Sequence, residues 1–166
     1  MVQIRPAVDI DAPAIAGLIA SLAHLFLASP DSAGAALFLA LTTCAALTAF
    51  MTRAEVVYLV SEMNGELCGA FGVVCNQHKP PHLHHLFVVP YFQGRGIGWQ
   101  LWSARTACGR VRQDCEWVHG KCKFDAIPGY QRFGFETVGT VVQANGLIFQ
   151  PMQQLLRLSN TADSVN

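Results

Sequence analysis

The sequence predicts a single domain of the mixed α/β or α+β class, in which strands adjoin and alternate with helices. The chain has 166 residues, of which 52% are hydrophobic and only 13% are charged. That length suits one domain, and that composition supplies enough apolar material for a sizeable core. Two Asn-Gly pairs, Asn64-Gly65 and Asn145-Gly146, predict tight hairpin turns between strands.

The first 51 residues predict a strand and two helices. Residues 2–5 form a short apolar strand, and Asp9 or Asp11 can cap the helix that follows. Apolar residues at helical spacing mark this helix: Ile15, Leu18, Ile19, Leu22 and Leu25. Residues 29–32 break it, and a second helix is expected over residues 32–51. Residues 33–51 barely reach the roughly 20 residues of a bilayer span, so a buried helix is the preferred interpretation.

The rest of the chain predicts strands with two further helices. A glycine-rich turn at residues 93–98 leads into a helix with apolar residues along one face: Ile97, Leu101, Ala104 and Cys108. A short helix is expected at residues 125–133. Strands are expected at residues 55–62, 67–75, 82–89, 115–122, 135–142 and 147–149. The tail after Leu158 has the character of a frayed end, so the predicted domain comprises residues 1–158, followed by a tail at 159–166.

The charge distribution narrows the class of ligand. Lys plus Arg and Asp plus Glu number 11 each, so the formal net charge is zero. A protein that binds nucleic acid through bulk charge needs a basic excess, which argues against such a partner. Residues 95–132, however, contain seven basic and three acidic side chains, which gives this window a net charge of about +4. This window favours a compact anionic ligand.

The six cysteines predict reduced thiols in a cytoplasmic protein. They are Cys44, Cys68, Cys75, Cys108, Cys115 and Cys122. None forms a Cys-x-x-Cys pair, and several lie within apolar runs, where a thiol packs as a small hydrophobe. The N-terminal residues lack the apolar stretch of a signal peptide, so no oxidising compartment or disulfide framework is expected.

The densest motif is the turn that follows residues 86–90. An apolar strand runs into three glycines within five residues, Gly94, Gly96 and Gly98, and a helix begins at once. Glycines let the backbone approach a ligand, and the first turn of a helix offers unpaired N–H donors. The motif therefore predicts a cradle for a pyrophosphate. It is not a P-loop, and Trp99 replaces the third glycine of a dinucleotide fingerprint.

At these residues the sequence resembles the GNAT superfamily of acyl-CoA-dependent N-acyltransferases. The family's Gln/Arg-x-x-Gly-x-Gly/Ala motif is matched by Gln93, Gly96 and Gly98, and residues 126–135 resemble its Ala-x-x-x-Tyr-x-x-x-Gly-Phe junction. The opening residues 4–12 are also similar to a family N-terminus. The resemblance implies a twisted, mostly antiparallel sheet of about six to seven strands with a V-shaped splay, flanked by about four helices.

The resemblance implies acetyl-CoA as the co-substrate. The pantetheine arm would pair with residues 86–88 like an extra strand, the Val88 N–H would face the thioester oxygen, and the amides of the glycine turn would hold the pyrophosphate. Lys123 replaces a family asparagine and is expected to meet a phosphate instead. The expected cofactor-binding residues are Leu86, Phe87, Val88, Gln93, Gly94, Arg95, Gly96, Ile97, Gly98, Trp99 and Lys123.

The resemblance also implies the catalytic residues. Tyr130 matches the family tyrosine that donates a proton to the leaving thiolate. Many relatives carry a glutamate on the strand before the turn, but here that strand begins His82-Leu83-His84-His85. His82 occupies the matching position and is the first candidate base, followed by His84, with Glu116 and His119 in reserve. By alternation, His82 and His84 share one face with Leu86, and His85 takes the other.

Taken together, these features predict an N-acetyltransferase that acetylates a primary amine by direct attack. Residues 21–52 contain a single acid, Asp31, so a small amino compound or a peptide amine suits the apolar helices better than a polycation. Members of the family are often dimers, which makes a homodimer compatible with the prediction. A membrane or nucleic-acid partner is not expected.

Two alternatives remain open. One is a binding module that senses acyl-CoA without turnover, because a fold does not guarantee activity. The other is a zinc-dependent hydrolase that uses Cys75, His78, His82 and His84 as ligands. Residues on opposite faces of a strand cannot all converge on one metal ion, so no metal is included in the preferred interpretation.

Overall fold

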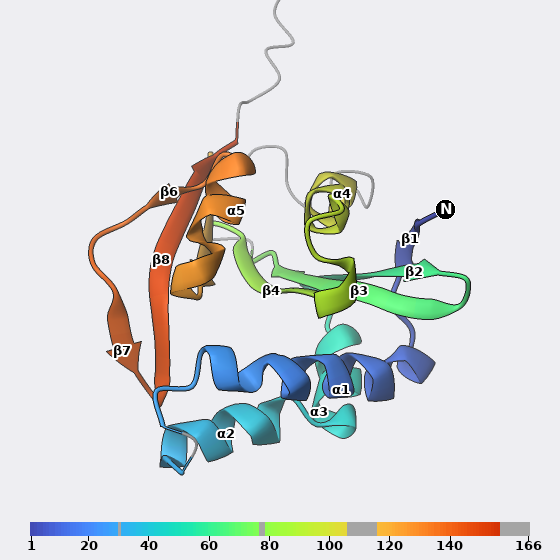
Figure 1. Ribbon diagram of the computed structural model, residues 1–166, viewed down its shortest axis with the longest axis horizontal. Coiled ribbons are helices and arrows are strands. Elements are labelled where there is room, and N and C mark those ends of the chain that lie inside the picture. Colours follow the sequence, from blue (N-terminus) through green and yellow to red (C-terminus); the bar gives the residue numbers. More distant parts are fainter. Residues whose placement is uncertain (30, 77–78, 106–115, 157–166) are drawn as a thin grey trace, which may run out of the picture.

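The computed structural model describes residues 1–29, 31–76, 79–105 and 116–156. Within them, five α-helices surround one sheet of eight strands (Figure 1). The strands are β1 (Gln3–Pro6), β2 (Val56–Met63), β3 (Glu66–Val74), β4 (His82–Val88), β5 (Trp117–Cys122), β6 (Glu136–Thr137), β7 (Val142–Ala144) and β8 (Leu147–Leu155). The helices are α1 (Ala12–Leu22), α2 (Ala33–Leu41), α3 (Cys44–Met51), α4 (Ile97–Ala104) and α5 (Ile127–Arg132). The expected α+β class is confirmed.

The sheet splits into two arms between β4 and β5. Its order is β1-β2-β3-β4-β5-β8-β6, with β7 paired to β8. Neighbouring strands are antiparallel except β4 and β5, which are parallel and pair only at His82 with His119 and at Leu83 with Gly120. Beyond Leu83 the two strands separate, and Figure 1 shows β8 running steeply across the direction of β2 and β3. The V-shaped splay expected from the sequence is therefore present.

The helices cover both faces of the β1–β4 arm (Figure 1). In that view α4 lies above the arm and α1 and α3 lie below it, while α5 lies beside β8 and α2 lies below α1, near the lower end of β8. The upper core includes Phe71, Leu101, Trp102 and Phe135. The lower core includes Ile15, Ile19, Leu47 and Val60. Of these helices, α1 and α4 bury an apolar face against the sheet, as the periodicity of their sequences predicts.

Both Asn-Gly turns are confirmed. Asn64 and Gly65 have φ of 54° and 81°, and Asn145 and Gly146 have φ of 51° and 74°. Positive φ at both central residues is what a two-residue type I′ hairpin requires. The first turn joins β2 to β3, and the second joins β7 to β8.

The single helix expected over residues 32–51 is wrong, because the segment forms α2 and α3, bent by 59° at their junction. Ser32 caps α2 by accepting the N–H of Ala35 at 3.1 Å. Thr43 is extended, with φ −66° and ψ 159°, and its hydroxyl accepts the N–H of Ala46 at 3.3 Å. Thr43 therefore ends one helix and begins the next, since an N-cap residue is not helical.

The expected burial of this segment is also wrong for α2. Leu37, Leu39 and Leu41 are 55%, 42% and 62% exposed. No single described helix is long and apolar enough to cross a membrane, although α2 and α3 meet the length and composition test when taken as a bent pair.

The strand expected over residues 135–142 is divided into β6 and β7. Gly139 between them has φ of 63°, and the Gln150 side-chain amide donates to the carbonyl oxygens of Val138 and Gly139 at 3.3 and 3.4 Å. These hydrogen bonds hold residues 138 and 139 between the two strands.

The strand β8 is longer than the three residues expected, because it pairs with β5, β6 and β7 along its length.

Asp11 does not cap α1 with its side chain, contrary to expectation. Its carboxylate instead accepts two hydrogen bonds from the Arg5 guanidinium, at 2.7 and 2.9 Å, and one from the Val8 N–H at 2.8 Å. Arg5 also contacts Glu62 of β2 at 2.8 Å. The pair thus ties the start of α1 to the edge of the sheet, and the Arg5 hydrogen bonds lower the pKa of Asp11.

Asp11→Asn is expected to lower the free energy of unfolding at pH 7 by about 1–2 kcal/mol. The expected loss is no larger because Arg5 is partly exposed and water screens the ion pair. A lowered pKa in the folded state contributes stability above the unfolded pKa and loses it as pH falls. The deficit should therefore shrink below about pH 4. Urea denaturation at pH 7 and pH 3 measures both values; a deficit of equal size at the two pH values would contradict the assignment.

Candidate active site

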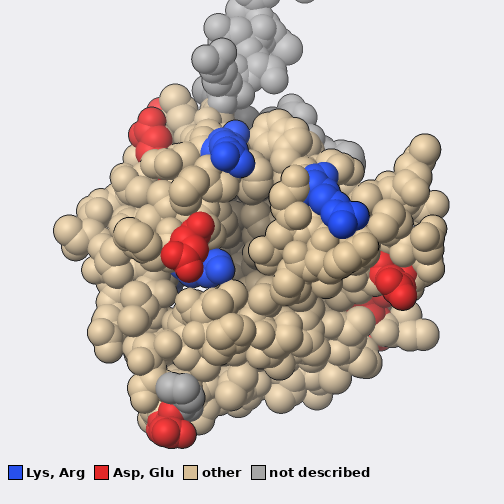
Figure 2. Space-filling view, in the orientation of Figure 1, with Lys and Arg blue, Asp and Glu red and all other residues tan. Residues whose placement is uncertain are grey.

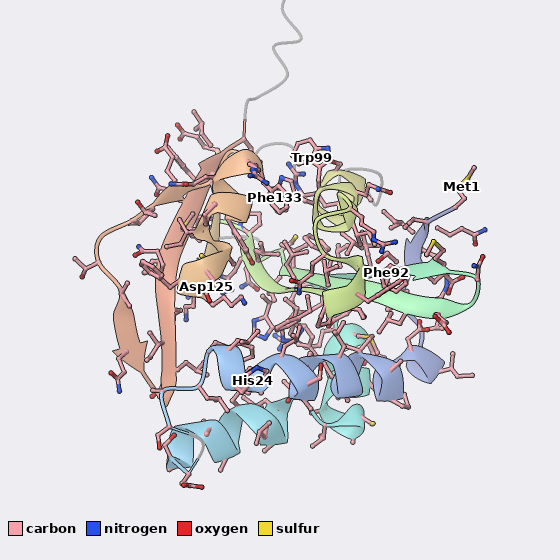
Figure 3. The ribbon with its side chains drawn as sticks, in the orientation of Figure 1. Met1, His24, Phe92, Trp99, Asp125 and Phe133 are labelled. Atoms are coloured by element: carbon pink, nitrogen blue, oxygen red, sulfur yellow. The ribbon has the colours of Figure 1, made fainter. Side chains whose placement is uncertain are left out.

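A cavity of about 830 Å³ occupies the opening between the two arms of the sheet. Its walls come from the end of α1, from α2, from β4, from the glycine turn, from the end of β5 with α5, and from the β7–β8 hairpin. Figure 2 shows the corresponding hollow at the centre of the face, with basic side chains around it. An acidic side chain lies at its rim, where Figure 3 labels Asp125.

The glycine turn forms one wall of this cavity. Gly94 and Gly96 have φ of 75° and 79°, a left-handed conformation that glycine adopts without strain. Gly96 is the N-cap of α4, so the unpaired N–H groups of the first turn begin there. The Gln93 side-chain amide donates to the Val88 carbonyl oxygen at 3.0 Å, which holds the turn against the end of β4.

The edge of β4 that faces β5 offers backbone groups to the cavity. The Val89 N–H donates to the Cys68 carbonyl at 2.9 Å, toward β3. Because alternate residues of an antiparallel ladder direct their N–H groups to opposite sides, the N–H groups of Leu86 and Val88 face away from β3. β5 has already separated from β4 at this point. An extended ligand could therefore pair with residues 86–88 as a strand does.

The predicted distribution of the histidines over the two faces of β4 is wrong. The pairing of β3 with β4 shifts register between Gly72 and Val73, so that His84 lies in a bulge between Leu83 and His85. The bulge brings His85 to the face of His84, and both rings contact Phe50 of α3, with centroids 5.8 and 4.8 Å away.

Leu86 packs on the opposite face, in the upper core with Leu83 and Val88. A bulge places two residues against one, which ends the alternation on which the prediction relied.

The three histidines form a row on the cavity wall. The His84 ring lies 6.2 Å from that of His82 and 4.5 Å from that of His85. Burial lowers the pKa of His82 to about 4, with His84, Lys121 and His119 adding to the shift. Burial, followed by Lys121 and Arg53, also lowers the pKa of His84. His82 is therefore neutral near pH 7. The pKa of His84 is shifted in the same direction, which favours its neutral form.

His85 and Tyr58 form a pair that the sequence did not indicate. The Tyr58 hydroxyl and His85 Nδ1 are 3.0 Å apart, and both side chains are buried. Gly72 makes this approach possible, because a Cβ there would lie 2.8 Å from the Tyr58 ring. The pair anchors the end of the histidine row within the lower core.

Tyr130 lies in the cavity wall on α5 and is 8% exposed. Its ring packs against Phe133 and Phe135, with centroids 6.1 and 5.5 Å away. Among the described residues its hydroxyl has no hydrogen-bond partner. Burial, with a smaller contribution from Cys122, raises the pKa of the phenol well above its ordinary value, so the hydroxyl keeps its proton at neutral pH.

Most of the predicted site residues meet at this cavity. The lining includes His82, His84, Leu86, Phe87, Val88, Gln93, Gly94, Gly96, Ile97, Gly98, Trp99, Lys123 and Tyr130. Arg95 is the exception: its guanidinium lies over the Tyr91 ring, 4.7 Å from the centroid, and outside the lining. Of the reserve bases, neither Glu116 nor His119 lines the cavity.

The mouth and the charged lining add four residues to the predicted site, namely Phe133, Lys121, Arg132 and Asp125. Figure 3 shows Trp99 and Phe133 at the top of the view, with ring centroids 5.8 Å apart. The charged side chains of the described lining are Lys121, Lys123, Arg132 and Asp125. Three positive charges against one negative fit the anionic ligand that the basic window predicted.

The far end of the cavity is closed by the chain between α1 and α2. The Ala28 N–H donates to the Gly146 carbonyl at 2.8 Å, and the Ile148 N–H donates to the Phe26 carbonyl at 3.0 Å. At Gly34 a Cβ would lie 2.0 Å from the Asn145 carbonyl oxygen. This close packing fixes α2 against the β7–β8 hairpin.

Within the described residues, no three His, Cys, Asp or Glu side chains are placed to hold a metal ion together. His78, one of the four ligands of the zinc alternative, lies outside the described residues.

A splayed mixed sheet, with a backbone edge that runs into a glycine turn, defines the class of acyl-CoA-dependent N-acyltransferases. Comparison with known proteins agrees: the family model described as an acetyltransferase (GNAT) domain matches residues 26–156. The chain therefore belongs to the GNAT acetyltransferase family, whose enzymes use acetyl-CoA as co-substrate and transfer its acetyl group to an amine.

Individual relatives support this membership. An uncharacterised N-acetyltransferase from Methanocaldococcus jannaschii is 37% identical over 95 residues, which cover 52% of this chain and 42% of that protein. The chain thus spans less than half the length of this curated relative.

Among solved structures, the fold is similar to the PaiA N-acetyltransferase of Thermoplasma acidophilum in complex with coenzyme A, with a TM-score of 0.71 and 12% sequence identity. The match covers 93% of this chain and 99% of that protein. It is also similar to N-acetylglutamate synthase of Neisseria gonorrhoeae, with a TM-score of 0.68, 20% identity, and 95% and 35% covered.

Proposed function

We propose that this protein transfers the acetyl group of acetyl-CoA to a primary amine by direct attack. The observation that carries the proposal is the continuity of one cavity: the open edge of β4, the glycine turn and Tyr130 all line it. The edge suits the pantetheine arm, the turn suits the pyrophosphate, and Tyr130 lies where a proton donor could serve the sulfur. The proposal extends to a single catalytic domain of residues 1–158.

The cofactor side of the mechanism relies on backbone groups. The amides from Gly94 to Trp99 would donate to the pyrophosphate, with Lys123 nearby to meet a phosphate. The Val88 N–H, which faces the opening, would donate to the thioester oxygen. Such a donor gains strength as negative charge develops in the tetrahedral intermediate, so it stabilises the transition state more than the substrate.

The acid is Tyr130. Nitrogen–carbon bond formation and carbon–sulfur bond cleavage leave a thiolate on coenzyme A, which accepts the phenolic proton. The raised pKa of Tyr130 keeps that proton in place before the reaction. Because the hydroxyl has no partner in the described part of the chain, it is available to the sulfur.

The base must take a proton from the incoming ammonium. His84 lies four residues from Val88 along β4, whereas His82 lies six residues away, a difference of about 7 Å at the usual rise of a strand. His84 also stands between the other two histidine rings. We therefore favour His84 over His82, acting directly or through a water molecule.

A covalent acyl-enzyme is disfavoured by the chemistry of the cavity. Cys122 lines the cavity, but burial raises the pKa of its thiol to about 11. A nucleophilic cysteine needs a lowered pKa, since the thiolate is the reactive form. Direct attack by the amine is the simpler route.

The acceptor is a small-molecule or peptide amine, in a protein that we propose to be cytoplasmic. Asp125 is the one acid in the described lining, against Lys121, Lys123 and Arg132. A polycation would meet repulsion there. A homodimer is also proposed and can be tested by light scattering of the purified protein.

A release assay tests the proposal. The protein is incubated with acetyl-CoA and a panel of amines, amino acids and peptides, while coenzyme A release and coenzyme A binding are measured separately. Amine-dependent release supports the enzyme. Tight binding without release for any amine would favour the sensor, and absence of binding would overturn the cofactor assignment.

His84→Gln is expected to lower kcat about a hundredfold, a typical loss for a general base. His82→Gln should lower it severalfold or less, and neither variant should weaken coenzyme A binding. Steady-state kinetics from pH 6 to 9 measures the difference, with the acceptor concentration kept saturating. The opposite order of the two variants would transfer the role of base to His82.

A further inference from the structure

The acceptor end of the cavity has an apolar wall that no protein segment covers in the described part of the chain. Leu25, Leu37, Leu41 and Ile148 line the cavity and yet are 39%, 55%, 62% and 39% exposed. Apolar side chains left open within a concave site are typical of a binding surface for an apolar group.

The geometry of α2 directs this wall toward the ligand. Leu37 and Leu41 are four residues apart and so share one face of the helix, and both line the cavity. Leu39 is 42% exposed but is not part of the lining. The close packing of Gly34 against Asn145 fixes α2 in this orientation.

Lys121 supplies a positive charge to the same end of the cavity. Its ammonium lies 4.6 Å from the Phe149 ring centroid on β8, and both residues line the cavity. Lys121 also contributes to the lowered pKa of both His82 and His84, which places its charge near the histidine row. Within the described residues Lys121 forms no ion pair, so it can receive an anionic group of a ligand.

We propose that the acceptor is an amine that carries both an apolar group and a carboxylate, as a free apolar amino acid does. The inference rests on the proposed function and names its substrate class. The apolar group packs on Leu37, Leu41 and Ile148, the carboxylate lies at Lys121, and the amine faces His84.

The reaction then balances without a further reactant. The amine nitrogen forms a bond to the acetyl carbon as the carbon–sulfur bond breaks. His84 takes one proton from the ammonium before attack and releases it to solvent, and the second proton passes from nitrogen to His84 as the carbon–sulfur bond breaks. The thiolate takes its proton from Tyr130, and His84 returns its proton through water to the Tyr130 phenolate. The products are an N-acetylated amino acid, coenzyme A and one proton in solution.

Binding to the protein saturated with coenzyme A tests the inference independently of turnover. The probes for titration calorimetry are L-leucine, isoamylamine, which lacks the carboxylate, L-serine, which lacks the apolar group, and spermidine, a polycation. L-leucine should bind at least about tenfold more tightly than each of the others. Equal or tighter binding of isoamylamine, L-serine or spermidine would overturn the proposal.

Variants assign the contacts. Leu41→Asp should weaken L-leucine binding about tenfold, whereas Leu39→Asp, the matched change on the other side of α2, should leave it unchanged. Lys121→Gln should weaken L-leucine about tenfold and leave isoamylamine unchanged. Equal effects of Leu41→Asp and Leu39→Asp, or of Lys121→Gln on the two ligands, would contradict the assignment.

The two proposals fail in different ways. If L-leucine binds as expected but releases no coenzyme A from acetyl-CoA, the acceptor class stands and the enzymatic proposal fails. If coenzyme A is released with spermidine or isoamylamine while L-leucine does not bind, the enzyme stands and the acceptor class is wrong.

Discussion

Gly96→Val is expected to lower the affinity for coenzyme A by at least about a hundredfold, which would correspond to losing two charge-assisted hydrogen bonds of about 1.5–3 kcal/mol each. Gly96 has φ of 79°, a conformation that a β-branched residue avoids. A Cβ at this position would have a single neighbour within 4 Å, Gln100 Nε2 at 3.9 Å. The added side chain would therefore project into the space proposed for the pyrophosphate and displace the ligand rather than the core.

A matched control separates backbone strain from loss of the ligand. Gly65 has φ of 81°, and a Cβ there would meet nothing within 4 Å, but it lies in the β2–β3 hairpin and not in the cavity lining. Gly65→Val should thus cost similar stability and leave coenzyme A affinity unchanged. Titration calorimetry and thermal unfolding of both variants measure the two quantities. Retained affinity in Gly96→Val would remove the turn from the cofactor site.

The elements that the sequence predicted best are those fixed by neighbouring residues. The Asn-Gly turns and the glycine turn depend on which residues tolerate positive φ, and that preference is local. The break between α2 and α3 had a local signal too, since Thr43 is a preferred N-cap residue. The continuous hydrophobicity of residues 33–51 outweighed that signal in the prediction.

The histidine row could not be predicted, because the bulge at His84 depends on the partner strand. Gly72 of β3 stands opposite His85 and leaves room for the Tyr58 ring. Strand alternation is a rule for regular pairing, and nothing within residues 82–88 alone shows that the register shifts there. Tyr130, His82 and His84 still line the cavity, since their motif positions do not depend on the register shift; their roles as acid and base stay predictions.

The end of the cavity at which we propose that the acceptor binds was the least predictable part of the site. Lys121 is 84 residues from Leu37 in the sequence, and both reach the cavity only after β5 has paired with β8 and α2 has packed on the β7–β8 hairpin. Because residues 33–51 were predicted to form a buried helix, the exposed leucines of α2 that line the cavity were not expected. Contacts of this kind depend on tertiary packing, which a local pattern does not encode.

Tyr130→Phe is expected to lower kcat by about a hundredfold to a thousandfold and to leave coenzyme A affinity nearly unchanged. The change removes the hydroxyl proton and keeps the ring contacts with Phe133 and Phe135. Because burial raises the pKa of Tyr130, the wild-type enzyme should show no loss of activity from this group as pH rises to about 10. A transition-state role lowers kcat, whereas loss of a ground-state contact would raise KM instead.

Tyr91→Phe provides the control for this experiment, because Tyr91 is 72% exposed and does not line the cavity. Its variant should keep wild-type kcat and KM, since Arg95 can rest on a phenylalanine ring as it rests on tyrosine. Single-turnover measurements with acetyl-CoA and a saturating amine distinguish the chemical step from product release. If Tyr130→Phe and Tyr91→Phe have the same single-turnover rate as the wild type, the proton comes from water or from the acceptor itself, and Tyr130 is a packing residue of the cavity wall.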